Sequence, residues 1–157
     1  MVYKKGLDPV YDENTQILIL GSCPGDLSIQ KQQYYSSPNN QFWKLLSQIL
    51  NIDLSNLSYE ERINQLIKNK IGLWDVMHNC VREGSLDSNI ESFEANDFSK
   101  LQLNNLKLIL FNGKKAFEKK DLVNLNVEKR LLPSSSGANA IPFQEKLSAW
   151  KKEIGRV

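Results

Sequence analysis

The sequence predicts a three-layer αβα domain, in which helices cover both faces of a central, mostly parallel sheet of four strands. Short apolar runs alternate with segments whose apolar residues recur at helical spacing, which is the pattern of strands connected by helices. The first apolar run has no polar face, as is typical of a central strand in a parallel sheet. A chain of 157 residues suits one domain better than two, so we expect a single domain over residues 1–157.

Four apolar segments are the predicted strands. The clearest, residues 16–20, reads Gln-Ile-Leu-Ile-Leu and is stopped by Gly21 and Pro24. The other three cover residues 71–76, 106–111 and 127–132. Ligands of such folds bind beyond the carboxyl ends of the strands. Three polar segments rich in Gly, Pro and Ser follow predicted strands and are therefore candidate site segments, namely 21–40, 75–88 and 133–139.

Helices are predicted between these strands. Residues 40–50 carry apolar side chains at helical spacing. Ser58 and Glu61 form a capping box that opens a helix running through residue 67. A short helix starts after Gly113, and a longer one covers about residues 142–154.

The composition is that of a folded protein without a membrane-spanning segment. The apolar fraction of 41% and the charged fraction of 24% exclude an intrinsically disordered chain. With 20 Lys and Arg against 18 Asp and Glu, the net charge of +2 leaves both nucleic acids and small molecules as partners. No apolar run approaches the roughly 20 residues that a membrane helix needs. The polar start of the chain is not a signal peptide, so we expect no membrane partner.

The cysteines lie far apart and in no metal-binding spacing. Cys23, Cys80 and the single histidine, His78, cannot complete a four-ligand zinc site, so we expect no metal. We expect both cysteines to be free. Free cysteines without an export signal indicate an intracellular, cytoplasmic protein.

One candidate reaction centre is a nucleophile. Residues 21–25 read Gly-Ser-Cys-Pro-Gly, which could form a strand-to-helix elbow with Cys23 attacking and His78 as base. Such an elbow stabilises the oxyanion with the N–H of the residue after the nucleophile, and Pro24 has none. A plain tight turn is the alternative interpretation of this segment.

Two other segments offer binding chemistry. Gly113, Lys114 and Lys115 do not satisfy the Walker pattern, but lysines at a helix start attract phosphate oxygens, and a solvated helix start is the alternative. Tyr34 and Tyr35 could stack on flat bases, although one of the two could equally belong to the core.

Several motifs, taken in order, resemble the uracil-DNA glycosylase superfamily. Residues 21–25, followed by Tyr-Ser-Ser-Pro-Asn-Asn-Gln-Phe-Trp at 35–43, look like motif one of its mismatch-specific branch. The hypoxanthine-DNA glycosylase branch is resembled more closely, through residues 20–28, 32–35, 73–76, 80–88 and 132–139. The resemblance runs from about residue 6 to residue 150, which is nearly the whole chain.

The resemblance implies a fold of the uracil-DNA glycosylase type and an enzyme that flips a damaged base out of DNA and hydrolyses its N-glycosidic bond. It implies DNA as the partner and no cofactor. Asn40 matches the working asparagine of the hypoxanthine branch, where an amide aligns the attacking water; capping the next helix is its alternative role. An oxocarbenium-like transition state needs little push from the nucleophile. Ser134 stands where relatives polarise the leaving base, so it is the second predicted catalytic residue.

The base-binding residues are also implied by the resemblance. Tyr35 falls where the family stacks a ring on the flipped base, and Asp75 where relatives read its edge. An ionised carboxylate only accepts hydrogen bonds, which favours the N3–H of uracil or the N1–H of hypoxanthine. Gly21, Cys23 and Pro24 complete the base-binding segment, with Cys23 in place of an asparagine of the mismatch-specific branch.

Residues 134–139 resemble motif two, which grips the DNA backbone and fills the hole left by the flipped base. Ala138 stands where a leucine wedge is familiar, and Gly137 replaces a proline, which should loosen the loop. We therefore expect mispaired or single-stranded DNA to be preferred, because extrusion costs less there. The predicted DNA-binding residues are Ser22, Ser135, Ser136, Gly137, Ala138, Asn139, Lys114 and Lys115.

The sequence thus predicts a monomeric DNA glycosylase that releases deaminated bases, hypoxanthine or uracil, and leaves an abasic site. The pocket motifs contain no lysine for a Schiff base, so the enzyme should be monofunctional. Two rivals stay open. One is a nucleic-acid-binding module of the same fold without turnover, and the other is a small-substrate hydrolase that uses Cys23 as nucleophile.

Overall fold

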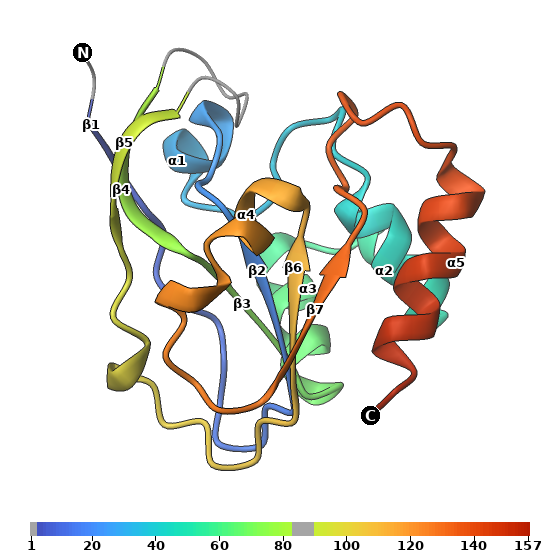
Figure 1. The fold of residues 1–157 in the computed structure, drawn as a ribbon. Coiled ribbons are helices and arrows are strands. Elements are labelled where there is room, and N and C mark those ends of the chain that lie inside the picture. The colour runs from blue at the N-terminus through green and yellow to red at the C-terminus, as the bar shows by residue number, and fades with distance from the viewer. Residues whose placement is uncertain (1–2, 83–89) are drawn as a thin grey trace.

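The computed structural model describes residues 3–82 and 90–157 of the chain. Its centre is a sheet of four parallel strands in the order β3 (Ile71–Asp75), β2 (Ile17–Gly21), β6 (Leu108–Asn112) and β7 (Glu128–Leu132) (Figure 1). Every residue of β2, β3 and β6 is buried, as the continuous apolar runs predicted. The predicted four-stranded sheet is confirmed, with strand boundaries that shift by one or two residues.

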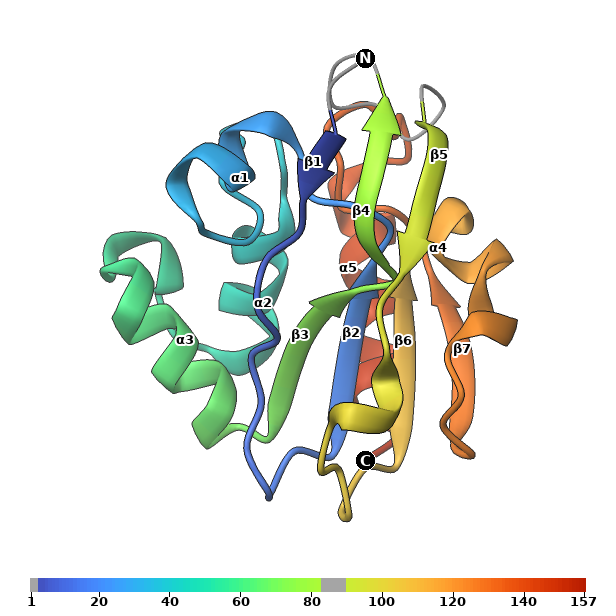
Figure 2. The same cartoon turned by 90° about the vertical axis from the view of Figure 1, so that its left-hand side faces the viewer.

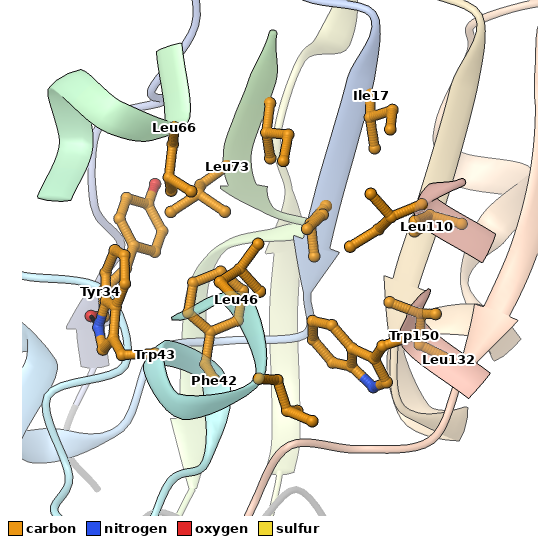
Figure 3. Close-up of a cluster of buried hydrophobic side chains, with 14 of the residues drawn as sticks. Ile17, Tyr34, Phe42, Trp43, Leu46, Leu66, Leu73, Leu110, Leu132 and Trp150 are labelled. Atoms are coloured by element: carbon orange, nitrogen blue, oxygen red, sulfur yellow. Dashed lines mark hydrogen bonds between the residues drawn. The ribbon is translucent and has the colours of Figure 1, made fainter. Parts of the chain in front are cut away.

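Three helices cover one face of this sheet. They are α2 (Phe42–Leu50), α3 (Tyr59–Lys68) and α5 (Phe143–Ile154). The predicted capping box starts α3, because the Ser58 hydroxyl accepts a hydrogen bond from the Glu61 N–H at 3.2 Å. Figure 3 shows the core between these layers, where Phe42 and Trp150 pack beside strand residues such as Leu110 and Leu132.

The other face packs against short elements. Its strand residues, which include Leu18, Leu20 and Phe111, contact Phe98 and Ala116. The covering elements are α4 (Lys114–Glu118), the 3₁₀ turn η3 (Phe98–Lys100) and Val123, which directly follows the 3₁₀ turn η4 (Lys120–Leu122). Two further elements lie outside this layer, α1 (Asp26–Lys31), which follows β2, and η1 (Leu54–Asn56), which follows α2.

A second sheet was not predicted. It is antiparallel, in the order β1 (Tyr3–Lys5), β4 (Met77–Arg82) and β5 (Ile90–Ala95). Figure 2 shows β4 and β5 running on beyond the carboxyl ends of β2 and β6. The candidate site segment 75–88 is therefore mostly strand as far as it is described, and its residues 83–88 lie outside the described residues.

The expectation of two free cysteines is wrong. Cys23 and Cys80 form a disulfide, with their Cα atoms 6.7 Å apart. The unpredicted strand β4 brings Cys80 beside the loop that follows β2, and both residues are buried together with Met77. With both cysteines in a disulfide, the expected reducing compartment no longer follows from free thiols. A disulfide sulfur is also no thiolate nucleophile, so the structure contradicts the hydrolase that attacks with Cys23.

Candidate active site

One cavity of about 670 Å³ opens where the strands of the central sheet end. All predicted site residues line it except the two lysines, namely Gly21, Ser22, Cys23, Pro24, Tyr35, Asn40, Asp75, Ser134, Ser135, Ser136, Gly137, Ala138 and Asn139. The loops that follow β2 and β7 form two of its walls, and they come together above the sheet in Figure 1. A volume of this size admits a purine or a pyrimidine.

Asn40 is held in one orientation by its neighbours. Its Oδ1 accepts hydrogen bonds from the Phe42 N–H at 3.0 Å and from the Ser135 hydroxyl at 2.8 Å. The N-cap of α2 is Gln41 and not Asn40, so the first bond holds the start of the helix from one residue before the cap. Both lone pairs of Oδ1 are occupied, and the side-chain NH2 is the group left to act in the pocket.

Asn112 was missed by the sequence analysis. It is the last residue of β6, is buried and lines the cavity. Its Nδ2 donates to the Ser135 hydroxyl at 2.9 Å, and its Oδ1 accepts from the Ser135 N–H at 2.9 Å. Hydrogen bonds therefore run in one direction from Asn112 through Ser135 to Asn40. Its place at the end of a buried apolar strand, like Asp75, was the signal that could have revealed it.

Of the two neighbouring tyrosines, Tyr35 is a site residue and Tyr34 is a core residue. Tyr35 lines the cavity, and its ring stacks on Phe42 with centroids 4.0 Å apart and planes 18° apart. Its backbone is left-handed, with φ of 56°, which is uncommon for a bulky residue and typical of functional sites. Tyr34 is buried, and its hydroxyl donates to the Asp8 carbonyl at 2.5 Å. Burial raises the pKa of Tyr34, and the Asp75 carboxylate raises it further.

Gly21 makes room for the Asp75 carboxylate. The two residues are paired across β2 and β3, and a Cβ on Gly21 would lie 2.6 Å from Asp75 Oδ1. Asp75 is only 4% exposed, and its backbone carbonyl accepts a hydrogen bond from Asn96 Nδ2 at 2.7 Å. The bond from Asn96 holds the backbone of Asp75, and its carboxylate is buried, where a hydrogen bond is stronger than in water.

The loop after β7 is in direct contact with the loop after β2. A Cβ on Gly137 would lie 2.4 Å from the Asn39 carbonyl oxygen, so only glycine permits this approach. The Gln41 N–H donates to the Ser135 carbonyl at 2.8 Å and adds a second link. Gly137 is therefore a contact point between the two walls. The expectation that this glycine loosens the loop stays a prediction.

Ser134 shapes the turn as well as lining the cavity. Its hydroxyl oxygen accepts from the Ser136 N–H at 3.2 Å, and its carbonyl accepts from Asn139 Nδ2 at 3.0 Å. The hydroxyl proton is not used in that turn, so the group keeps a donor.

Helix α5 anchors this loop through two side chains. Trp150 Nε1 donates to the Pro133 carbonyl at 2.8 Å, and Lys146 Nζ donates to the Ser136 carbonyl at 3.1 Å. Lys146 is 1% exposed, and burial lowers the pKa of its ammonium group. Lys146 was not predicted as a site residue, although it lies three residues after Phe143 and four before Trp150, on the apolar face of the predicted helix.

The predicted DNA-contacting residues differ in exposure. Gly137, Ala138 and Lys114 are exposed. Ser22 and Ser135 are buried, and the Ser135 hydroxyl is bonded to two amides inside the protein, so it does not face a phosphate in this conformation. Lys114 and Lys115 start α4 directly after Gly113, where an added Cβ would lie 3.2 Å from the Cβ of Ser134 at the cavity.

Within the described ranges, no group of three His, Cys, Asp or Glu side chains is placed to hold a metal ion. In the same ranges, no helix has both the length and the apolar character to cross a membrane.

Comparison with known proteins places this fold and cavity in a family. Residues 9–154 match the model of the uracil DNA glycosylase superfamily. A "hypoxanthine DNA glycosylase" of Methanosarcina barkeri is 48% identical over 156 residues, covering 98% of this chain and 99% of the relative. A protein of the same name from Methanosarcina acetivorans is 48% identical over 151 residues, covering 94% and 96%.

A solved structure agrees with the sequence relatives. The solution NMR structure of a candidate uracil DNA glycosylase from Methanosarcina acetivorans superposes with a TM-score of 0.88. It is 46% identical and covers 99% of this chain and 98% of its own. The resemblance found in the sequence motifs, and the fold expected from it, are confirmed.

Proposed function

Because the chain belongs to the uracil DNA glycosylase superfamily and is a DNA glycosylase for deaminated bases, we propose that hypoxanthine is its main substrate base. The names of the two Methanosarcina relatives support this choice. The observation that carries the mechanism is the fixed Asn40 amide in a cavity that also holds a stacked aromatic ring and a buried carboxylate.

The flipped base stacks on Tyr35 in this proposal. One face of the Tyr35 ring rests on Phe42, so the ring is braced before the base arrives. Offset stacking on a preformed aromatic platform costs little reordering. The Asp75 carboxylate then accepts the N1–H of hypoxanthine. Adenine has a lone pair at this ring nitrogen and would be repelled, so the normal base is rejected.

Asn40 holds the attacking water by donating to it. Its Oδ1 is occupied by Phe42 and Ser135, so the NH2 group binds the oxygen of the water. This aligns the water without removing its proton, which is adequate when the glycosidic bond is largely broken before attack. Departure of the base leaves negative charge on its ring, and the Ser134 hydroxyl can donate a hydrogen bond to it.

The remaining features set the kind of DNA that is used. Ala138 is exposed on the loop after β7 and is too small to wedge a base pair apart. Mispaired or single-stranded DNA is therefore the preferred substrate, and Lys114, Lys115 and the loop backbone contact its phosphates. Of the described residues, those that line the cavity include no lysine, which supports hydrolysis without a Schiff base. We expect a monomer that acts inside the cell, where genomic DNA lies.

The test is base release from matched DNAs. Labelled duplexes and single strands carry hypoxanthine, uracil or xanthine at one position, and alkali-labile nicks report abasic sites. Wild type should nick hypoxanthine DNA fastest, and Asn40→Ala should lose about 100-fold or more in single-turnover rate. Asn126→Ala is the control, because Asn126 is exposed and lies before β7, at the opposite end of the sheet.

Two outcomes would contradict the proposal. Full activity in Asn40→Ala would remove the water-holding role. Duplex binding without nicking of any substrate would favour the rival function, a binding module of the same fold.

A further inference from the structure

A buried cation lies directly behind the cavity without lining it. Lys146 is 1% exposed and projects from α5. Its Nζ donates to Gln41 Oε1 at 2.8 Å and to the Ser136 carbonyl at 3.1 Å. These two acceptors belong to different walls of the active site, and their residues are 95 positions apart in the sequence.

Stability alone is a poor reason for a lysine here. Among the described residues, the ion pairs join Arg130 and Arg156 to Glu128 and Glu153, and none includes Lys146. Burying an ammonium with neutral partners costs free energy that an apolar side chain of the same length would not. Burial is also the cause that lowers its pKa. The position of the charge therefore calls for a role beyond packing.

The two acceptors are the immediate neighbours of the residues that fix Asn40. Gln41 follows Asn40, and Ser136 follows Ser135, whose hydroxyl donates to Asn40 Oδ1. The Gln41 N–H also donates to the Ser135 carbonyl at 2.8 Å. Lys146 thus completes a closed ring of hydrogen bonds through Ser136, Ser135 and Gln41, and Asn40 lies on the cavity side of that ring.

We propose that Lys146 is a positioning residue for base release, which clamps the two walls so that the Ser135 hydroxyl meets the Asn40 amide. The role in catalysis rests on the proposed function of Asn40, whereas the clamp itself does not. A compact ammonium can donate to both acceptors at once. Without it, Ser136 and Gln41 lose a buried donor, the walls separate, and the Asn40 amide is free to rotate.

Lys146→Met is the variant that tests the clamp, because methionine has nearly the same length and no donor. Lys152→Met is the matched control, since Lys152 is exposed on the same helix and carries the same charge. Single-turnover release of hypoxanthine should slow by about tenfold or more in Lys146→Met, because small misplacements of a catalytic group are costly. The Kd for hypoxanthine duplex should stay within about twofold of wild type, since the buried ammonium does not face the DNA.

A second variant guards against misfolding of the first. Gln41→Leu removes the acceptor on the other wall and leaves the lysine in place. It should slow release in the same direction but less, because the link from Lys146 to Ser136 survives. Base release that is unchanged in Lys146→Met, or a loss of rate fully matched by a loss of duplex binding, would overturn the positioning role.

Hydrogen exchange tests the clamp independently of activity. In wild type the Gln41 amide is bonded to the Ser135 carbonyl, and in Lys146→Met it should exchange about tenfold or more faster. The amide of Ile109, in the central sheet, should keep its protection in both proteins. Equal protection of Gln41 in the two proteins would overturn the clamp. If wild type releases no base at all, the proposed function fails, and this measurement still decides about Lys146.

Discussion

The two walls of the active site are supported in different ways. The wall after β2 rests on the hydrophobic core, because the Tyr35 ring lies on Phe42, which is fully buried and packs edge-on against Trp150. The wall after β7 is exposed at its tip, Gly137 and Ala138, and is held by hydrogen bonds, from α5 through Trp150 and Lys146 and from β6 through Asn112. The Tyr35 ring, which is proposed to receive the base, is thus held rigid by hydrophobic packing. The loop after β7, which is proposed to contact DNA, is held by individual hydrogen bonds that single substitutions can remove.

Phe42→Ala should break the first wall and have the largest effect. Removing this fully buried ring should lower the free energy of unfolding by about 3–5 kcal/mol and deprive Tyr35 of its support. Leu54→Ala is the control, since Leu54 is equally buried in the same core and does not line the cavity. Urea unfolding measures both losses. At a temperature where both variants are folded, only Phe42→Ala should lose base release, and equal activity in the two would refute the support role.

Breaking the disulfide tests the covalent link between the wall after β2 and strand β4. Cys23 and Cys80 are 57 residues apart, and the link should stabilise the fold by about 2–4 kcal/mol. Thermal unfolding with and without reductant measures this contribution. The double variant Cys23→Ser with Cys80→Ser is the control, because reductant should not change its Tm. A wild-type Tm that is unaffected by complete reduction, checked by mass spectrometry of the thiols, would contradict the prediction.

Gly137→Ala should force the walls apart at their contact. The added Cβ would meet the Asn39 carbonyl, so the loop after β7 must shift, at a cost of about 1–3 kcal/mol. Base release should fall more than the Tm suggests, because the link between Ser135 and Asn40 depends on this approach. Gly155→Ala at the end of α5 serves as the control, where φ of −70° suits alanine. Unchanged single-turnover kinetics would show that the walls need not touch.

Ala138→Leu should give the loop after β7 a wedge for duplex DNA and should have the smallest effect of these substitutions. A larger apolar side chain at this exposed tip can enter the space left by the flipped base. Release from duplex DNA should rise a few-fold, and release from single strands should not change. Competing reactions with the two substrates in one tube give the ratio directly. An equal rise on both substrates would argue against a wedge.

The sequence predicted what depends on local patterns. The apolar runs at 16–20 and 106–111 locate the central strands, and the Ser58 capping box locates the start of α3. Polar residues interrupt the run from Met77 to Arg82, which hid β4, and with β4 hidden the approach of Cys80 to Cys23 could not be anticipated.

The candidate site was predicted in part for the same reason. Asp75 is the last residue of β3, and Tyr35 and Asn40 belong to a recognisable motif in the segment after β2; all three line the cavity. Asn112 and Lys146 were missed because they act through tertiary hydrogen bonds. Their partners, Ser135 and Ser136, are 23 and 10 residues away in the sequence, and no local pattern encodes such contacts. Motifs identify the groups that face the ligand better than the groups that hold them.

Because the hydrogen bonds run one way from Asn112 through Ser135 to Asn40, the residue at the carboxyl end of β6 determines which side of the Asn40 amide faces Ser135. An aspartate in place of Asn112 could only accept, so the Ser135 hydroxyl would turn toward it and offer Asn40 a lone pair. The Asn40 amide would then either flip and lose its bond to the Phe42 N–H, or keep that bond and face the Ser135 lone pair with its own oxygen. A substitution at position 112 would therefore change the orientation of the Asn40 amide without replacing Asn40 itself. The NMR resonances of the Asn40 side-chain NH2 group would report that orientation.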